Sequence, residues 1–112
     1  MIKTTPEQNK TLVLQAFDTL FNKRLFNLVR STPPTLKYEP GLIVAENDYV
    51  IVHGRFSGTG RPRNWIAADV VRVADGVLTE HWDVLQDEAT KAESRSGLPM
   101  FGTTFPSERS SR

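Results

Sequence analysis

The chain has 112 residues, and its 14 basic and 13 acidic side chains leave a net charge of +1. It shows no basic run or stripe, so nucleic acid is not an expected partner. The absence of cysteine excludes disulfides, thiolate catalysis and cysteine-based zinc sites, and two histidines alone could hardly make a dedicated transition-metal site. No apolar run approaches membrane-spanning length and no signal peptide opens the chain, so we expect a cytoplasmic protein without a membrane segment.

The first predicted element is an amphipathic helix. Thr5-Pro6-Glu7-Gln8 supplies an N-cap, a proline at the first helical position and a capping-box partner. Apolar side chains follow at helical spacing: Val13, Ala16, Phe17, Leu20, Phe21, Leu25, Leu28 and Val29. Ser31-Thr32-Pro33-Pro34 ends the pattern, because proline removes a backbone donor. The sequence therefore predicts one helix over 6–30, roughly 37 Å long, which is more than a compact domain of this size needs.

Strand-like segments fill the middle of the chain. Two short candidates, 35–39 and 42–46, flank Pro40-Gly41, which we interpret as a turn or a bulge. Three longer candidates cover 49–56, 65–73 and 77–85, and Asp75-Gly76 between the last two is a strong hairpin signal. The periodicity is lost after Gln86. We expect a single domain over 1–106 and a disordered tail over 107–112.

The turns predict a register for these strands. A loop centred near Arg61 places His53 opposite Asp69, and a turn centred on Asp75-Gly76 places Asp69 opposite Trp82. Opposite partners share a face of the sheet, so His53 and Asp69 are predicted neighbours. The same predicted face carries the candidate ligand-binding residues: Trp82, Arg55, Tyr49, Ile51, Val71 and Glu80. His81 and Asp83 are predicted to lie on the opposite face, toward solvent or an interface.

Two motifs carry a family resemblance. Asp69-Val-Val-Arg-Val-Ala-Asp-Gly76 is followed by Glu80-His-Trp-Asp83, and the chain from 38 to about 105 resembles the SnoaL-like polyketide cyclase family of the nuclear transport factor 2-like superfamily. The resemblance implies a cone-shaped α+β fold, with an N-terminal helix on a curved antiparallel sheet around an apolar pocket. It also implies aldol-type acid-base chemistry without metal or cofactor, in which Asp69 is the catalytic acid/base, His53 a pocket partner and Trp82 a wall residue.

This chemistry suits a cyclase, isomerase or lyase that acts on a small apolar carbonyl compound. A desolvated aspartate has a raised pKa, which favours proton abstraction next to a carbonyl. Two alternatives stay open: Asp69 with His53 or Arg55 can be a structural ion pair, and the domain can be a non-catalytic module that binds a small ligand or dimerises. Arg55 can bind an anionic group, but a cross-strand ion pair is the expected role for it.

The chain is shorter than the family pattern after its first helix. About two dozen residues, which carry a second short helix and part of the pocket wall, have no counterpart between Arg24 and Leu25. We expect a homodimer built on the sheet face that carries Val50, Val52, Phe56, Ile66, Ala68 and Val70. The unbroken helical pattern through 22–25 also predicts an N-terminal segment that leaves its own sheet and exchanges between the two copies.

Overall fold

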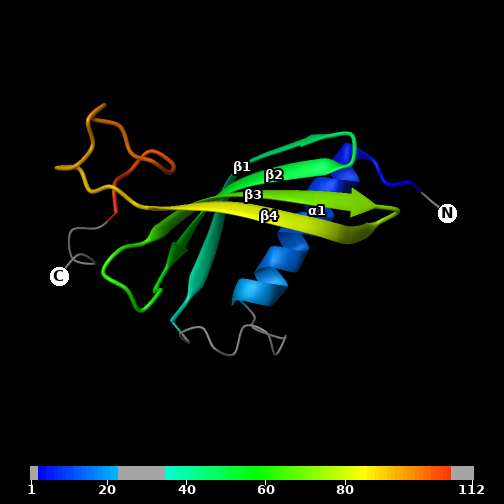
Figure 1. Ribbon diagram of the computed structural model, residues 1–112, viewed down its shortest axis with the longest axis horizontal. Coiled ribbons are helices and arrows are strands. Elements are labelled where there is room, and N and C mark those ends of the chain that lie inside the picture. The colour runs from blue at the N-terminus through cyan, green and yellow to red at the C-terminus, as the bar shows by residue number, and fades with distance from the viewer. Residues whose placement is uncertain (1–2, 23–34, 107–112) are drawn as a thin grey trace.

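The computed structural model describes residues 3–22 and 35–106 (Figure 1). The elements are an α-helix α1 (Pro6–Phe17), a π-helix η1 (Asp18–Asn22) and four strands, β1 (Lys37–Glu46), β2 (Tyr49–Ser57), β3 (Trp65–Ala74) and β4 (Val77–Asp87). The strands form one antiparallel sheet in the order β1-β2-β3-β4, curved but unclosed, and α1 lies across one of its faces. The predicted α+β class is confirmed. Within the described ranges, no helix is long and apolar enough to cross a membrane.

The start of α1 follows from its sequence. The Thr5 hydroxyl accepts the Gln8 amide at 3.1 Å and the Gln8 side chain accepts the Thr5 amide at 2.9 Å, so the predicted capping box is confirmed. The helical backbone then continues through η1 to Asn22. The Asn22 side chain accepts the Tyr38 amide at 2.8 Å and donates to the Tyr38 carbonyl at 3.0 Å, which fixes the helix end to β1. The predicted continuation of the helix over 23–30 lies outside the described residues.

The core lies between α1 and the sheet face that it covers, which we call the helix face. Val13 and Phe17 of α1 pack there with Val50, Val52 and Val71, all of them at most 3% exposed. The apolar stripe of α1 is therefore buried on its own sheet. The expectation that the first helix leaves its own sheet is wrong for α1. Exchange between two copies stays a prediction.

An aromatic cluster closes one side of this core. The Tyr38 ring lies within 5.6 Å of the rings of Phe17, Phe21 and Phe56, measured between centroids. Tyr38 takes this position because β2 has a glycine beneath it. A Cβ atom on Gly54 would lie 2.5 Å from the Tyr38 hydroxyl oxygen, which is closer than any side chain allows. Gly54 thus sets where the tyrosine hydroxyl points.

The turns and the first strand agree with the sequence pattern. Asp75 and Gly76 have φ of 52° and 80°, as the predicted two-residue turn requires. The two short strands that we expected around Pro40-Gly41 are one strand, β1, whose pairing with β2 shifts between Pro40 and Ile43. The bulge is therefore the correct alternative for Pro40-Gly41.

The predicted register is wrong by one residue in two places. The last β2–β3 pair is Phe56 with Trp65, so the loop is centred between Gly60 and Arg61 instead of on Arg61. Asp69 consequently pairs with Val52, and His53 pairs with Ala68. The β3–β4 register is as expected beside the turn, but it shifts by one residue after Val73 pairs with Leu78.

The shift leaves Thr79 as an extra residue in β4, since Arg72 pairs with Glu80 and Val73 pairs with Leu78. Beyond this bulge Asp69 faces Asp83, and Trp82 faces Val70. A slip of one residue moves every side chain to the other face. The predicted groupings of β3 side chains with those of β2, and with those of β4 beyond the bulge, are therefore wrong; beside the turn, Val73 pairs with Leu78 as expected.

The predicted dimer surface is one of these wrong groupings. Val50, Val52 and Phe56 are buried on the helix face, beneath α1 and the aromatic cluster. Ile66, Ala68 and Val70 lie on the opposite face, which we call the outer face. The large exposed apolar side chains of the outer face include Val44, Tyr49, Ile51, Trp82 and Val84, with 41% to 70% of each accessible.

A segment after β4 is held to the sheet by a buried ion pair. The carboxylate of Glu88, which is 2% exposed, accepts Arg55 Nε at 2.9 Å and the Asn64 side-chain amide at 3.1 Å. The Arg55 guanidinium also stacks on the Phe101 ring, 4.8 Å from its centroid. This segment therefore covers part of the outer face around Arg55 and His53, whose ring lies 5.8 Å from that of Phe101.

Candidate functional site

Asp69 is a carboxylate buried in the middle of the sheet. It comes from β3, points to the helix face and is 2% exposed. Its neighbours along β3 on the same face, Ala67 and Val71, are fully buried apolar residues. Burial of a charged group without a partner costs several kcal/mol, so a carboxylate here must find polar contacts or bind a proton.

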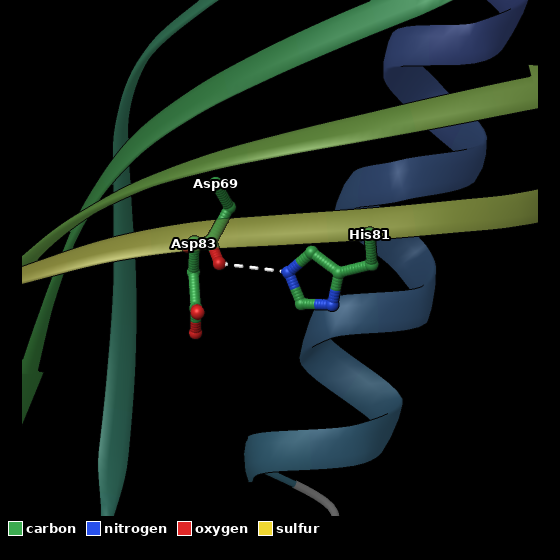
Figure 2. A group of neighbouring side chains, drawn as sticks. All are labelled: Asp69, His81 and Asp83. Carbon is green, nitrogen blue, oxygen red and sulfur yellow. Dashed lines mark hydrogen bonds and ion pairs between the residues drawn. The ribbon is translucent and has the colours of Figure 1, made fainter.

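His81 is the partner of Asp69 (Figure 2). Its Nε2 lies 2.8 Å from Asp69 Oδ1, and the two side chains come from adjacent strands. Asp83, which pairs directly with Asp69 across β3 and β4, lies on the other side of the same carboxylate. The His81 side chain is 42% exposed whereas that of Asp69 is 3% exposed, so the pair connects a buried carboxylate to the surface.

Two aromatic residues, Phe17 and Tyr38, lie beside the Asp69–His81 pair. The Phe17 ring lies 5.5 Å from the rings of both His81 and Tyr38, so α1 contributes an apolar wall between them. The Tyr38 hydroxyl and Asp69 Oδ2 are buried, and neither has a hydrogen-bond partner within the part of the chain that the structure describes. Such atoms are rare in proteins and call for an explanation, of which an absent ligand is one.

The electrostatics of the cluster favour the protonated form of Asp69. Desolvation by burial raises the pKa of Asp69, and the nearby Asp83 carboxylate raises it further, while the His81 hydrogen bond and charge partly oppose this shift. Desolvation, together with the charge of Asp69, also raises the pKa of Tyr38, so the phenol stays a neutral donor. A neutral phenol beside a carboxyl group of raised pKa is an acid-base arrangement.

The raised pKa of Asp69 predicts a pH-dependent cost to stability. A carboxyl group whose pKa is higher in the folded than in the unfolded chain stabilises the fold fully below its ordinary value of 3.8, and loses that contribution as the pH rises through the raised value. Asp69→Asn should therefore unfold at higher urea concentration than the wild type near neutral pH, and the difference should shrink toward about pH 3. Urea titrations across this range measure it; a difference independent of pH would contradict the assignment.

The predicted site residues are divided between the two faces. Asp69 and Val71 lie on the helix face. His53 is on the outer face, so its predicted contact with Asp69 is wrong, because adjacent pairs on β2 and β3 point in opposite directions. The other predicted ligand-binding residues are also on the outer face, away from Asp69: Tyr49, Ile51, Arg55, Glu80 and Trp82. Of these, Arg55 forms an ion pair as expected, but its partner Glu88 lies after the end of β4 instead of on a neighbouring strand.

Sequence reasoning missed the contributions of His81, Asp83 and Tyr38. The predicted register puts His81 and Asp83 on the opposite face, and the signal that corrects it is the bulge at Thr79. The Thr79 hydroxyl donates to the Arg72 carbonyl at 3.2 Å, which is a local mark of the irregularity. Tyr38 lies in a predicted strand and has no predicted role, although Gly54, the glycine against which its ring packs, is visible in the sequence.

The same cluster contains metal-binding atom types. Asp69, His81 and Asp83 each offer one ligand atom within 4.8 Å of the others. One imidazole and two carboxylates are ligands that divalent ions such as Zn²⁺ and Mn²⁺ accept. Clusters of this composition are also common as ion-pair networks, and the His81–Asp69 hydrogen bond already accounts for one of the carboxylate oxygens.

Comparison with known proteins gives one result on the family. No curated protein matches the chain. The profile of the SnoaL-like domain matches residues 15–81, which is more than half of the chain. The match begins in the last turn of α1 and includes the first three strands and both Asp69 and His81. Together with one helix on a curved, open antiparallel sheet, this match identifies the chain as a member of the SnoaL-like domain family, within the nuclear transport factor 2-like superfamily.

Proposed function

We propose that this protein binds a small apolar carbonyl compound on its helix face and transfers a proton at the carbon next to the carbonyl. Asp69 is the acid/base, and the reaction is of the cyclase, isomerase or lyase type without a cofactor. A cytoplasmic location belongs to the same proposal. The supporting family match is that of the SnoaL-like domain, whose matched residues include Asp69.

One observation carries the proposal. Asp69 is buried with one oxygen held by His81 at 2.8 Å and the other without a partner among the described residues. A fully structural ion pair would be expected to satisfy both oxygens, because an unsatisfied buried acceptor costs about 1–3 kcal/mol. An oxygen left available beside apolar rings is what a base needs in order to reach a C–H bond.

Each neighbour has a distinct role in this mechanism. Asp69 Oδ2 accepts the proton from carbon, while the hydrogen bond from His81 to Oδ1 holds the carboxylate in place. The Tyr38 hydroxyl, kept neutral by burial, donates to the oxygen on which negative charge develops. Phe17 forms an apolar wall against both rings and keeps water from the carboxylate.

Hydrogen–deuterium exchange of simple ketones tests the proposal. The full chain is incubated with 2-tetralone, cyclohexanone or acetophenone in D₂O, with and without EDTA, and the loss of α-proton signals is followed by ¹H NMR. We expect exchange faster than in buffer alone that saturates with at least one ketone and persists in EDTA. Exchange at the buffer rate for all three would reject proton transfer, and exchange that EDTA abolishes would reject the cofactor-free mechanism.

A second candidate is a non-catalytic module that binds a ligand or dimerises. The observation that favours it is the exposed apolar row on the outer face, formed by Val44, Ile51 and Trp82 on β1, β2 and β4. A depression of about 370 Å³ beside Val44, Tyr49 and Ile51 adds room for a small apolar group. Absence of ketone exchange together with a dimer formed through the outer face would favour this candidate.

A further inference from the structure

The free edge of β4 is the most exposed regular element in the described structure. β4 is the last strand in the sheet order, so its outward backbone groups have no neighbouring strand there, and all eleven of its residues are exposed. Apolar side chains lie on both of its faces, with Trp82 and Val84 on the outer face and Leu85 on the helix face. A long exposed edge of this kind is a template for pairing with another strand.

The opposite edge of the sheet is protected. β1 contains Pro40, which cannot donate a backbone hydrogen bond, and its register shifts between Pro40 and Ile43. β4 has neither proline nor lysine, and its bulge lies at Thr79, near the turn. The eight residues from Glu80 to Asp87 pair regularly with β3. β1 therefore has a proline and a bulge in its middle, whereas β4 is regular over its last eight residues and has only a bulge near the turn and three carboxylates against pairing.

We propose that β4 pairs antiparallel with β4 of a second copy of this chain, about a two-fold axis that passes through Trp82. The two sheets then form one continuous sheet. This inference does not depend on proton transfer at Asp69, because it rests on the edge and its sequence.

The sequence of β4 selects this axis. A two-fold axis perpendicular to a sheet keeps each side chain on its own face. Residues that pair directly must point to the same face, so they are an even number of positions apart along β4. The axis therefore passes through a residue and not between two residues. An axis at Glu80 or at Asp83 would place two like carboxylates opposite each other. An axis at His81 would place the two imidazoles opposite each other and Glu80 opposite the indole of the partner's Trp82.

With the axis at Trp82 the strand is complementary to itself. His81 lies opposite the partner's Asp83, and the reciprocal pair forms on the other side of the axis. Both residues are on the helix face, and the two Trp82 side chains meet on the outer face. Trp82 is also the midpoint of β4, Val77–Asp87, so this axis gives the longest overlap of the two strands.

The pairing of the two β4 strands also adds a side chain of the partner to the candidate site. His81 uses Nε2 for Asp69, and Figure 2 shows its second ring nitrogen turned away from that carboxylate. In the paired sheet, the partner's Asp83 lies across the strand boundary from the same imidazole. Each copy would therefore place a carboxylate beside the His81 of the other.

Disulfide trapping tests this geometry, because the chain has no cysteine of its own. Three single variants are oxidised as full-length proteins: Trp82→Cys at the proposed axis, Asp83→Cys one residue away and Ile51→Cys on the outer face of β2. We expect Trp82→Cys to shift to the dimer mass fastest, since its two Cβ atoms meet directly. Two Asp83 positions would lie about two residues apart along the strands, beyond the reach of a disulfide.

Each other outcome overturns the proposal. Fastest trapping of Asp83→Cys would place the axis elsewhere, and fastest trapping of Ile51→Cys would indicate face-to-face contact through the outer face. Sedimentation velocity of the wild type gives a second measurement that no substitution affects. We expect a dimer at micromolar concentration, and a wild-type monomer across that range would reject the pairing.

Discussion

Replacing Asp69 by asparagine should remove ketone exchange while leaving the fold intact. Asparagine has nearly the same shape and can still accept the hydrogen bond that His81 makes to Asp69 Oδ1 at 2.8 Å. It cannot accept a proton from carbon at any accessible pH. General acid-base catalysis contributes typically about 10²–10⁴-fold, so the saturable exchange rate should fall by that factor.

The neighbouring carboxylate supplies a matched control. Asp83 pairs with Asp69 across the strands and raises the pKa of Asp69. Asp83→Asn removes that charge but keeps the base, so exchange should persist and its pH profile should shift toward lower pH. Loss of exchange in Asp69→Asn together with a shifted profile in Asp83→Asn assigns the proton to Asp69. Equal rates in Asp69→Asn and the wild type would exclude Asp69 as the base.

Asp69→Asn is expected to raise the stability to urea and to lower the rate of ketone exchange. The variant should be more stable near neutral pH, since no charge has to be desolvated, and inactive as a base. A residue retained for structure alone would show the reverse, with lower stability on substitution. This contrast separates a strained functional carboxylate from a structural ion pair, the two readings that the sequence left open for Asp69.

The local chemistry of the fold was predictable from short segments. The capping box at Thr5 and the turn at Asp75-Gly76 depend on residues within a few positions of each other, and both form as expected. The α+β class followed from one helical period and a series of strand-like segments. The match to the SnoaL-like domain over residues 15–81 agrees with the motifs that suggested that family.

The partners in the site were not predictable in the same way. Whether Asp69 meets His53 or His81 depends on a single residue of register in the loop after Ser57 and on the bulge at Thr79. Both are set by the packing of the whole strand, and a slip of one residue reverses every side chain. The sequence therefore identified Asp69 as the central carboxylate and assigned it the wrong histidine.

The burial of Glu88, after the last strand of the sheet, was also not predictable from the sequence. It follows β4 in a polar stretch where the strand pattern stops, and nothing nearby in the sequence marks it as buried. Its partners, Arg55 and Asn64, are more than twenty residues earlier in the chain. Burial of Glu88 is therefore a product of tertiary structure, and its stability effect is a strong test of the packing after β4.

We expect Glu88→Ala to lower the free energy of unfolding by about 3–5 kcal/mol, because it leaves the Arg55 guanidinium buried without its counter-ion. The side chains of Arg55 and Glu88 are 13% and 1% exposed, so little of this ion pair is accessible to water. The matched control is Glu93→Ala, which removes the carboxylate of the exposed Arg63–Glu93 pair, whose side chains are 39% and 42% exposed. That change should lower stability much less, because an ion pair exposed to water contributes little to the free energy of unfolding.

A double variant separates the charge effect from the loss of volume. In Arg55→Met with Glu88→Leu both charges are replaced by apolar groups of similar size, so no uncompensated ion remains. We expect this double variant to be more stable than Glu88→Ala, even though it changes two residues, with all variants compared by urea unfolding at one pH. Equal losses for Glu88→Ala and Glu93→Ala would show that Glu88 is solvated, and would contradict the packing of the segment after β4 against Arg55.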